Sequence, residues 1–141
     1  MDGETFKRRL VSLCMKDLPG LPKKEEDRHV LLKSIVLTMN PQKEYSHKEL
    51  QEILIEWLEG VGRSVGSDHA ALRREMVDDG FLTRDPAGTT YKINSQAPVN
   101  SAFDETVESI DTVAAVEEGR RLKAEKKRQF MQTKQGKGAS G

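Results

Sequence analysis

The fold is decided by residues 45–84, which read YSHKELQEILIEWLEGVGRSVGSDHAALRREMVDDGFLTR. Ser46 followed by Glu49 is a capping-box pattern, in which the hydroxyl and the carboxylate each accept a backbone N–H at the start of a helix. Apolar residues then recur every three or four positions, which predicts an amphipathic helix over about residues 46–59. These residues are Leu50, Ile53, Leu54, Trp57 and Leu58.

A second helix is predicted over about residues 67–79, after a Gly/Ser-rich connection at residues 60–67. Ser67 and Asp68 are both suited to its N-cap, and the pattern leaves the choice open. Its inward-facing residues are expected to be Leu72, Met76 and Val77.

Gly80 ends this helix, and two β-prone runs follow around the polar loop DPAG at residues 85–88. Short β-prone runs around a Pro/Gly loop predict a hairpin, which closes near Ile93. The order helix, turn, helix, hairpin is that of a winged helix-turn-helix, with the hairpin as the wing.

Two more helices are predicted before this unit. The first spans about residues 2–17 and places Cys14 on its apolar face, which favours a small buried hydrophobe over a reactive thiol. The second begins near Glu25 and stops at Asn40-Pro41. The run Lys43 to Tyr45 fits either a very short strand or a loop.

The C-terminal third is predicted to consist of a linker at 94–102, a charged helical arm at 103–132 and a disordered tail at 133–141. The arm has a thin apolar stripe of Phe103, Val107, Ile110 and Ala114. Its acids precede residue 119, with the single exception of Glu125, and its bases follow: Arg120, Arg121, Lys123, Lys126, Lys127 and Arg128. The predicted fold is therefore mainly α, of the α+β class: a winged helix-turn-helix domain at 1–93 with an extra N-terminal helix and a C-terminal helical arm.

Composition limits the kinds of partner. The 23 basic and 23 acidic residues give a formal net charge of zero, so no global charge attracts nucleic acid or membrane. The single cysteine cannot form an internal disulfide, which favours a reducing cytoplasm. No apolar run approaches the roughly 18 residues of a membrane-spanning helix, so a soluble protein without a membrane partner is expected.

No catalytic or metal-binding pattern is present in the sequence. His29, His47 and His69 lack the close paired spacing of local metal sites, and there is no Cys pair, phosphate loop or nucleophile elbow. We therefore expect no enzymatic activity, no metal and no cofactor.

The helix at 67–79 is the candidate reader of double-stranded DNA, because the second helix of a helix-turn-helix enters the major groove. Its outward candidates are Ser67, His69, Ala70, Arg73 and Arg74. Arginine suits guanine edges and phosphates because it donates two parallel hydrogen bonds. Residues placed to hold backbone phosphates are Lys48, Arg63, Arg84 and Lys92.

The acids of the same helix argue against this role, since phosphate neutralisation supplies most non-specific affinity for DNA. They are Asp68, Glu75, Asp78 and Asp79. In a structural alternative, Arg73 and Arg74 pair with acids of the preceding helix, namely Glu49, Glu52 or Glu56.

The basic arm has three interpretations. It is a solvated helix face, or a phosphate-binding arm, or a partner for the acidic segment 104–118 of a second chain in an antiparallel dimer. The third interpretation gives the alternative function, a protein-interaction module that dimerises or binds a partner through residues 103–131.

Residues 21–93 resemble the bacterial domain-of-unknown-function 2087 family. The matching motif positions are Tyr45, Lys48, Glu49, Leu50, Ile53, Leu54, Asp68, Leu72, Arg73, Arg74, Val77, Gly80 and Arg84. His47, Gln51 and a longer turn at 60–67 depart from the family pattern. The resemblance implies a winged-helix-like domain with a transcription-linked role, and it implies no activity or substrate.

Overall fold

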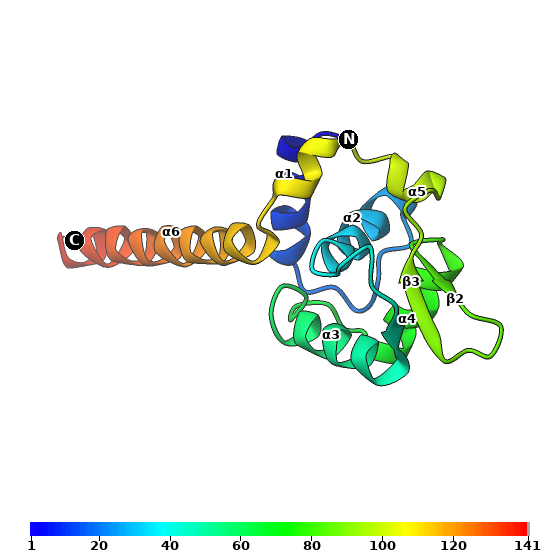
Figure 1. Ribbon diagram of the computed structural model, residues 1–141. Coiled ribbons are helices and arrows are strands. Elements are labelled where there is room, and N and C mark those ends of the chain that lie inside the picture. Colours follow the sequence, from blue (N-terminus) through cyan, green and yellow to red (C-terminus); the bar gives the residue numbers. More distant parts are fainter. Residues whose placement is uncertain (141) are drawn as a thin grey trace.

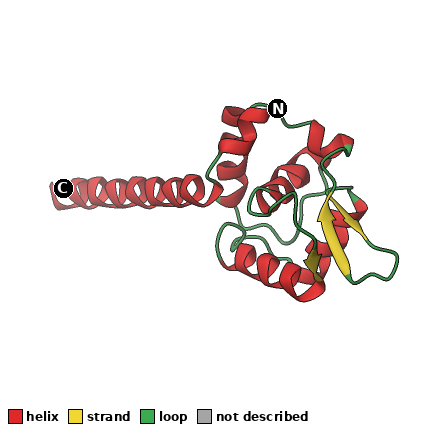
Figure 2. Cartoon of the chain, viewed as in Figure 1, coloured by secondary structure: helices red, strands yellow, loops and turns green. Residues whose placement is uncertain are grey.

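The computed structural model describes the backbone of residues 1–140 and the side chains of residues 1–132. The chain is mainly helical with one small antiparallel sheet, which confirms the α+β class (Figure 2). In chain order the elements are α1 (Gly3–Cys14), α2 (Glu25–Val36), β1 (Tyr45–Ser46), α3 (His47–Glu59), α4 (His69–Asp78), β2 (Leu82–Arg84), β3 (Thr90–Ile93), α5 (Pro98–Ser101), the 3-10 helix η1 (Glu105–Ser109) and α6 (Thr112–Ser140).

The central helix begins where the capping box predicts. The Ser46 hydroxyl accepts from the Glu49 N–H at 3.1 Å, and the Glu49 carboxylate accepts from the Ser46 N–H at 3.1 Å. Leu50, Leu54 and Trp57 are buried from this helix. The indole of Trp57 donates to the Ser34 hydroxyl of α2 at 2.9 Å, so its one polar atom is satisfied inside the core.

The following helix, α4, is capped by Asp68, whose carboxylate accepts from the Ala71 N–H at 2.7 Å. The choice between Ser67 and Asp68 is thereby resolved. Leu72 and Met76 are fully buried from α4. Gly80 ends the helix with a φ of 88°, a conformation that glycine adopts without steric cost.

The sheet has the strand order β1-β3-β2, and both pairings are antiparallel. The run before α3 is therefore a short strand, with Tyr45 opposite Tyr91 in β3. The predicted hairpin is present as β2 and β3, and it extends beyond α4 at the edge of the molecule (Figure 1).

The helices α1 and α2 of the N-terminal part supply a large share of the hydrophobic core. The helix α2 is buried along most of its length, and α1 packs against it (Figure 1). The loop after α1 joins the α3–α4 turn, because the Leu18 N–H donates to the Ser64 carbonyl at 2.9 Å and the Gly66 N–H donates to the Leu18 carbonyl at 2.7 Å.

Residues 94–111 differ from the sequence prediction, since they return to the body as part of the fold. The predicted linker contains α5, and Asn100 is buried. Its amide donates to the Asn94 carbonyl at 2.9 Å and accepts from the Lys33 ammonium at 3.3 Å. That ammonium also pairs with Glu108 at 3.1 Å.

The helix α6 begins at residue 112 instead of near residue 103, and Asp111 caps it by accepting from the Ala114 N–H at 3.1 Å. This later start changes which side chains face inward. Val107 is fully buried through η1, but Ala114 is exposed, and Ala115 and Val116 are buried instead. The predicted disordered tail at 133–141 lies outside the residues whose side chains are described.

Candidate nucleic-acid interface

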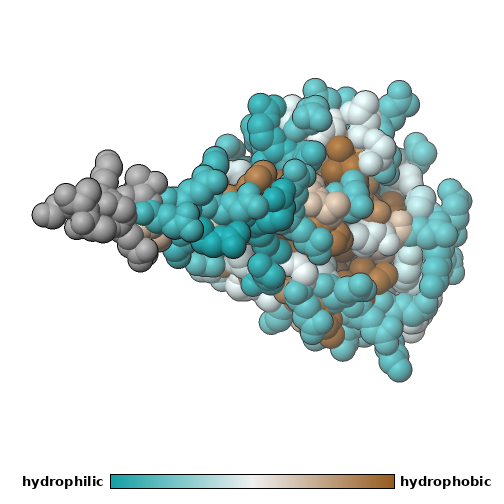
Figure 3. Space-filling model, turned by 90° about the vertical axis from the view of Figure 1, so that its left-hand side faces the viewer, coloured by the Kyte–Doolittle hydropathy of each residue, from teal (hydrophilic) through white to brown (hydrophobic). Residues whose placement is uncertain are grey.

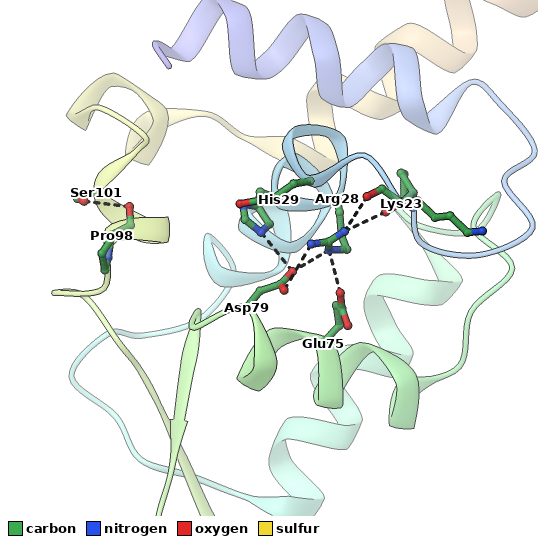
Figure 4. A network of polar contacts seen from close by, with 9 residues as sticks. Lys23, Arg28, His29, Glu75, Asp79, Pro98 and Ser101 are labelled. Carbon is green, nitrogen blue, oxygen red and sulfur yellow. Dashed lines mark hydrogen bonds and ion pairs between the residues drawn. The ribbon is translucent and has the colours of Figure 1, made fainter.

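Two of the four acids at α4 share one cation, Arg28 of α2. The Arg28 Nε lies 2.8 Å from a Glu75 oxygen and 2.8 Å from an Asp79 oxygen (Figure 4). The guanidinium also donates to the Lys23 carbonyl at 3.1 Å. The hydrogen bond with Asp79 raises the pKa of Arg28, so this cation stays charged beside its partners. We call Arg28, Glu75 and Asp79 the Arg28 clamp.

His29 lies beside the same clamp. Its Nε2 is 3.2 Å from the Asp79 carboxylate (Figure 4). Its ring meets Phe81 edge to face with centroids 5.3 Å apart. The Asp79 side chain is only 14% exposed. Its carboxylate therefore contacts side chains of α2 and is largely shielded from solvent.

The two arginines of α4 lie elsewhere on the helix. Arg73 places a guanidinium nitrogen 3.3 Å from His47 Nε2, and Arg74 is exposed. Within residues 1–132, no ion pair joins either arginine to a carboxylate. Glu49 instead pairs with Lys43 at 2.6 Å. The structural alternative, in which Arg73 and Arg74 form ion pairs with acids of α3, is therefore not observed among the described side chains.

His47 is a residue of this surface that sequence reasoning did not propose as a contact. It is the first residue of α3, and its ring packs at a tilt against Tyr91 with centroids 6.1 Å apart. It therefore links α4, through Arg73, to the sheet. Lys48, the next residue, is exposed as expected.

The start of α4 is less accessible than predicted. Ser67 and His69 are both half-buried. His69 Nδ1 is buried, and the described part of the chain offers it no hydrogen-bond partner. Of the bases predicted on this helix, Arg74 is exposed and Arg73 is half-buried, and the exposed acids are Asp78 and the capping Asp68.

The predicted wing residues do not face the same way. Thr83 is opposite Lys92 and Arg84 is opposite Tyr91 in the hairpin register. Paired residues of a hairpin share a face, and successive residues alternate. Arg84 and Lys92 are both exposed, but they lie on opposite faces of the hairpin.

Arg63 belongs to a different surface. It lies in the α3–α4 turn and lines a cleft of about 580 Å³ between α3 and α6, which we call the α3–α6 cleft. Arg120 of α6 lines the same cleft and donates to the Gly60 and Val61 carbonyls at 2.9 Å each. The structure therefore groups Arg63 with the base of α6.

Some bases of the arm hydrogen-bond to the body of the domain, and one forms an ion pair within the arm. Arg120 is held as described, the Lys123 ammonium donates to the Met15 carbonyl at 2.9 Å, and Arg121 pairs with Glu125 at 2.8 Å. Lys126, Lys127 and Arg128 are exposed, and no ion pair involves them among the described side chains.

Arg28 is the functional residue that sequence reasoning missed. It precedes Asp79 by 51 positions, and no local pattern relates the two. The sequence signal that could have identified it is its position in the first turn of α2, directly after three acids. A base near the N-terminus of a helix interacts unfavourably with the helix dipole, which indicates that it has an acidic partner elsewhere.

Within residues 1–132, no group of three or more His, Cys, Asp or Glu side chains is arranged to hold a metal ion. A search of the described helices finds none that is both long and apolar enough to cross a bilayer.

These features define a mainly helical α+β domain whose fourth helix turns its arginines outward. Residues 17–93 match the model of the family described as uncharacterized protein conserved in bacteria (DUF2087). The match covers more than half of the chain, so the chain belongs to this family, as the motif positions implied. No curated protein and no solved structure matches the chain.

Proposed function

We propose that the chain is a non-enzymatic, transcription-linked protein that binds double-stranded DNA through a winged helix-turn-helix. The order α2, β1, α3, α4, β2, β3 and the strand order β1-β3-β2 support the architecture. In this arrangement α4 is the recognition helix and the β2–β3 hairpin is the wing.

The charge distribution of α4 is the observation that carries the proposal. Its sequence contains two bases and several acids, which by itself disfavours DNA. The Arg28 clamp holds two of these acids toward α2, and Asp68 caps the helix. The outward surface then presents exposed Arg74 and half-buried Arg73 beside two exposed acids, Asp78 and the capping Asp68.

The surrounding bases define a footprint in this proposal. Lys48 at the start of α3 and Lys92 on the wing are exposed and suited to phosphate contacts. His47 supports Arg73 at 3.3 Å and limits the conformations that the arginine explores.

A reducing cytoplasm remains the proposed location. Cys14 is a free, buried thiol, and burial raises its pKa to about 11. Such a thiol is unreactive and behaves as a small hydrophobe, in keeping with a cytoplasmic protein.

Fluorescence anisotropy of a labelled random-sequence duplex tests the proposal. Arg73→Gln/Arg74→Gln is expected to weaken binding at least tenfold, because each arginine contact to a base or phosphate contributes about 1–3 kcal/mol. The matched control is Arg8→Gln/Arg9→Gln, an adjacent arginine pair on α1, on another side of α2 from α4 (Figure 1). Equal affinities for the two variants, or no binding by the wild type at low salt, would contradict the proposal.

A further inference from the structure

The helix α6 leaves the body after its first turns and projects alone (Figure 1). Its base is fixed: Ala115 and Val116 are buried, and Gly119 passes so close to α1 that an added Cβ would lie 2.5 Å from Val11. Farther along, its large apolar side chains are exposed. Leu122 is 44% exposed, Phe130 is 67% exposed and Met131 is 49% exposed.

One face of α6 carries a regular pattern along its described length. Its residues are spaced alternately by four and three positions, which places them on one stripe with a/d geometry, although three of the six are charged where a coiled coil has apolar residues. They are Val113, Glu117, Arg120, Ala124, Lys127 and Met131. We call this set the α6 seam. It spans residues 113–131, or about 27 Å of helix.

The α6 seam is complementary to itself when reversed. Opposite residues in a reversed copy have numbers that sum to 244, so Val113 meets Met131, Glu117 meets Lys127, and Arg120 meets Ala124. Each match is favourable: apolar with apolar, acid with base, and large with small. The order of residue types in the seam therefore encodes an antiparallel partner.

We propose that α6 pairs antiparallel with α6 of a second copy of this chain along the α6 seam. The two exposed apolar ends, Val113 at 48% and Met131 at 49%, then cover each other at both ends of the pair. This inference goes beyond duplex binding and does not depend on it.

The α3–α6 cleft supplies the seat for the partner's helix end. Three of the six seam residues, Val113, Glu117 and Arg120, line this cleft. Its apolar lining is completed by Ile53, Trp57, Val61 and Val116. Figure 3, viewed from the side on which α6 projects, shows hydrophobic surface on the body beside the base of this helix. The partner's Met131 fits this lining.

Charge favours the same placement. The cleft carries three exposed acids, Glu56, Glu59 and Glu117, against two bases, exposed Arg63 and half-buried Arg120, and Arg120 is held by the Gly60 and Val61 carbonyls. The approaching end of the partner helix carries Lys126, Lys127 and Arg128, which are exposed and without an ion pair among the described side chains. A parallel pair would instead set Glu117 against Glu117 and Lys127 against Lys127, which is repulsive.

Mixed disulfide trapping tests the register. A Val113→Cys chain and a Met131→Cys chain, mixed and mildly oxidised without DNA, are expected to form the mixed dimer in preference to either homodimer. Thr83→Cys, exposed on the hairpin, is the control for random collision. Homodimers as the main products, or a mixed dimer no faster than with Thr83→Cys, would overturn the proposal.

Charge reversal tests the pairing without covalent bonds. In sedimentation equilibrium, Lys127→Glu is expected to raise the dimer dissociation constant several-fold, because two ion pairs per dimer become repulsive. Glu117→Lys should act likewise, and the double variant Glu117→Lys/Lys127→Glu should restore wild-type association. Both side chains are exposed, and none of the ion pairs among the described side chains involves them. A monomeric wild type, or a double variant that stays dissociated, would refute antiparallel pairing.

Discussion

Replacing Arg28 by methionine removes the cation that holds the acids of α4. Methionine keeps part of the aliphatic stem but none of the donors, so Glu75 and Asp79 each lose a partner at 2.8 Å. A hydrogen bond to a charged group contributes about 1.5–3 kcal/mol. We assign little of the lost stability to Glu75, because its side chain is 31% exposed and water can replace the arginine. Most of the loss is assigned to Asp79, whose side chain is 14% exposed.

The expected destabilisation is about 2–3 kcal/mol, below the roughly 3–5 kcal/mol for breaking a fully buried pair. Urea unfolding followed by the fluorescence of Trp57 and by far-UV circular dichroism measures it. Arg8→Met is the control, because Arg8 is exposed on α1. A loss within about 0.5 kcal/mol of that control would refute the clamp, since surface substitutions lie in this range.

A double-mutant cycle then isolates the partner. Asp79→Asn is expected to destabilise the wild type but to cost little, or to stabilise, in the Arg28→Met background, because it removes an uncompensated charge. Additive effects of the two changes would show that Arg28 does not act through Asp79.

Three further predictions follow from individual side chains. The hydrogen bond from Lys43 holds the pKa of Glu49 at about 2, below its usual 4.5. This carboxylate therefore stabilises the fold fully above pH 4.5 and loses that contribution as the pH falls through 2. The difference in melting temperature between wild type and Glu49→Gln should shrink over that pH range, and a constant difference would contradict the prediction. Because burial raises the pKa of Cys14 to about 11, iodoacetamide at pH 8 should modify the native protein on the order of 100-fold more slowly than the urea-unfolded chain, and equal rates would refute the buried thiol. Lys33 is 3% exposed, so Lys33→Ala should be less stable than the volume-filling Lys33→Met by about 2 kcal/mol in urea unfolding, with equal stability as the contrary result.

Features set by neighbouring residues were predictable from the sequence. The capping box of Ser46 and Glu49 uses atoms three positions apart, and it fixes the start of α3. The hairpin was likewise predictable, because its turn and its β-prone runs are local. In each case a short stretch contains all the groups that satisfy its own backbone.

Features that depend on distant residues were not predictable. Lys33 holds residues 94–111 to the body through Asn100, which lies 67 positions away. Composition made this segment look like a linker, since its polar side chains have no local partners. The start of α6 was misplaced for the same reason, because Val107 belongs to the core through η1 and not through a continuous helix.

In the candidate site, too, locally determined features were predictable and features that depend on distant residues were not. That Arg73 and Arg74 belong to the second helix was evident from the pattern. Which charges reach the surface was not, because Arg28 approaches Glu75 and Asp79 from another helix. Counting charges along α4 therefore missed that Glu75 and Asp79 share a cation from α2.

The salt dependence of duplex binding tests most directly whether α4 is the surface that contacts DNA. The slope of log affinity against log salt concentration falls by about 0.9 for each phosphate contact that is lost. If Arg73 and Arg74 both lie on phosphates, Arg73→Gln/Arg74→Gln reduces the slope by about 1.8 relative to wild type, whereas Arg8→Gln/Arg9→Gln leaves it unchanged. Identical slopes and affinities for all three proteins would contradict DNA binding by this helix.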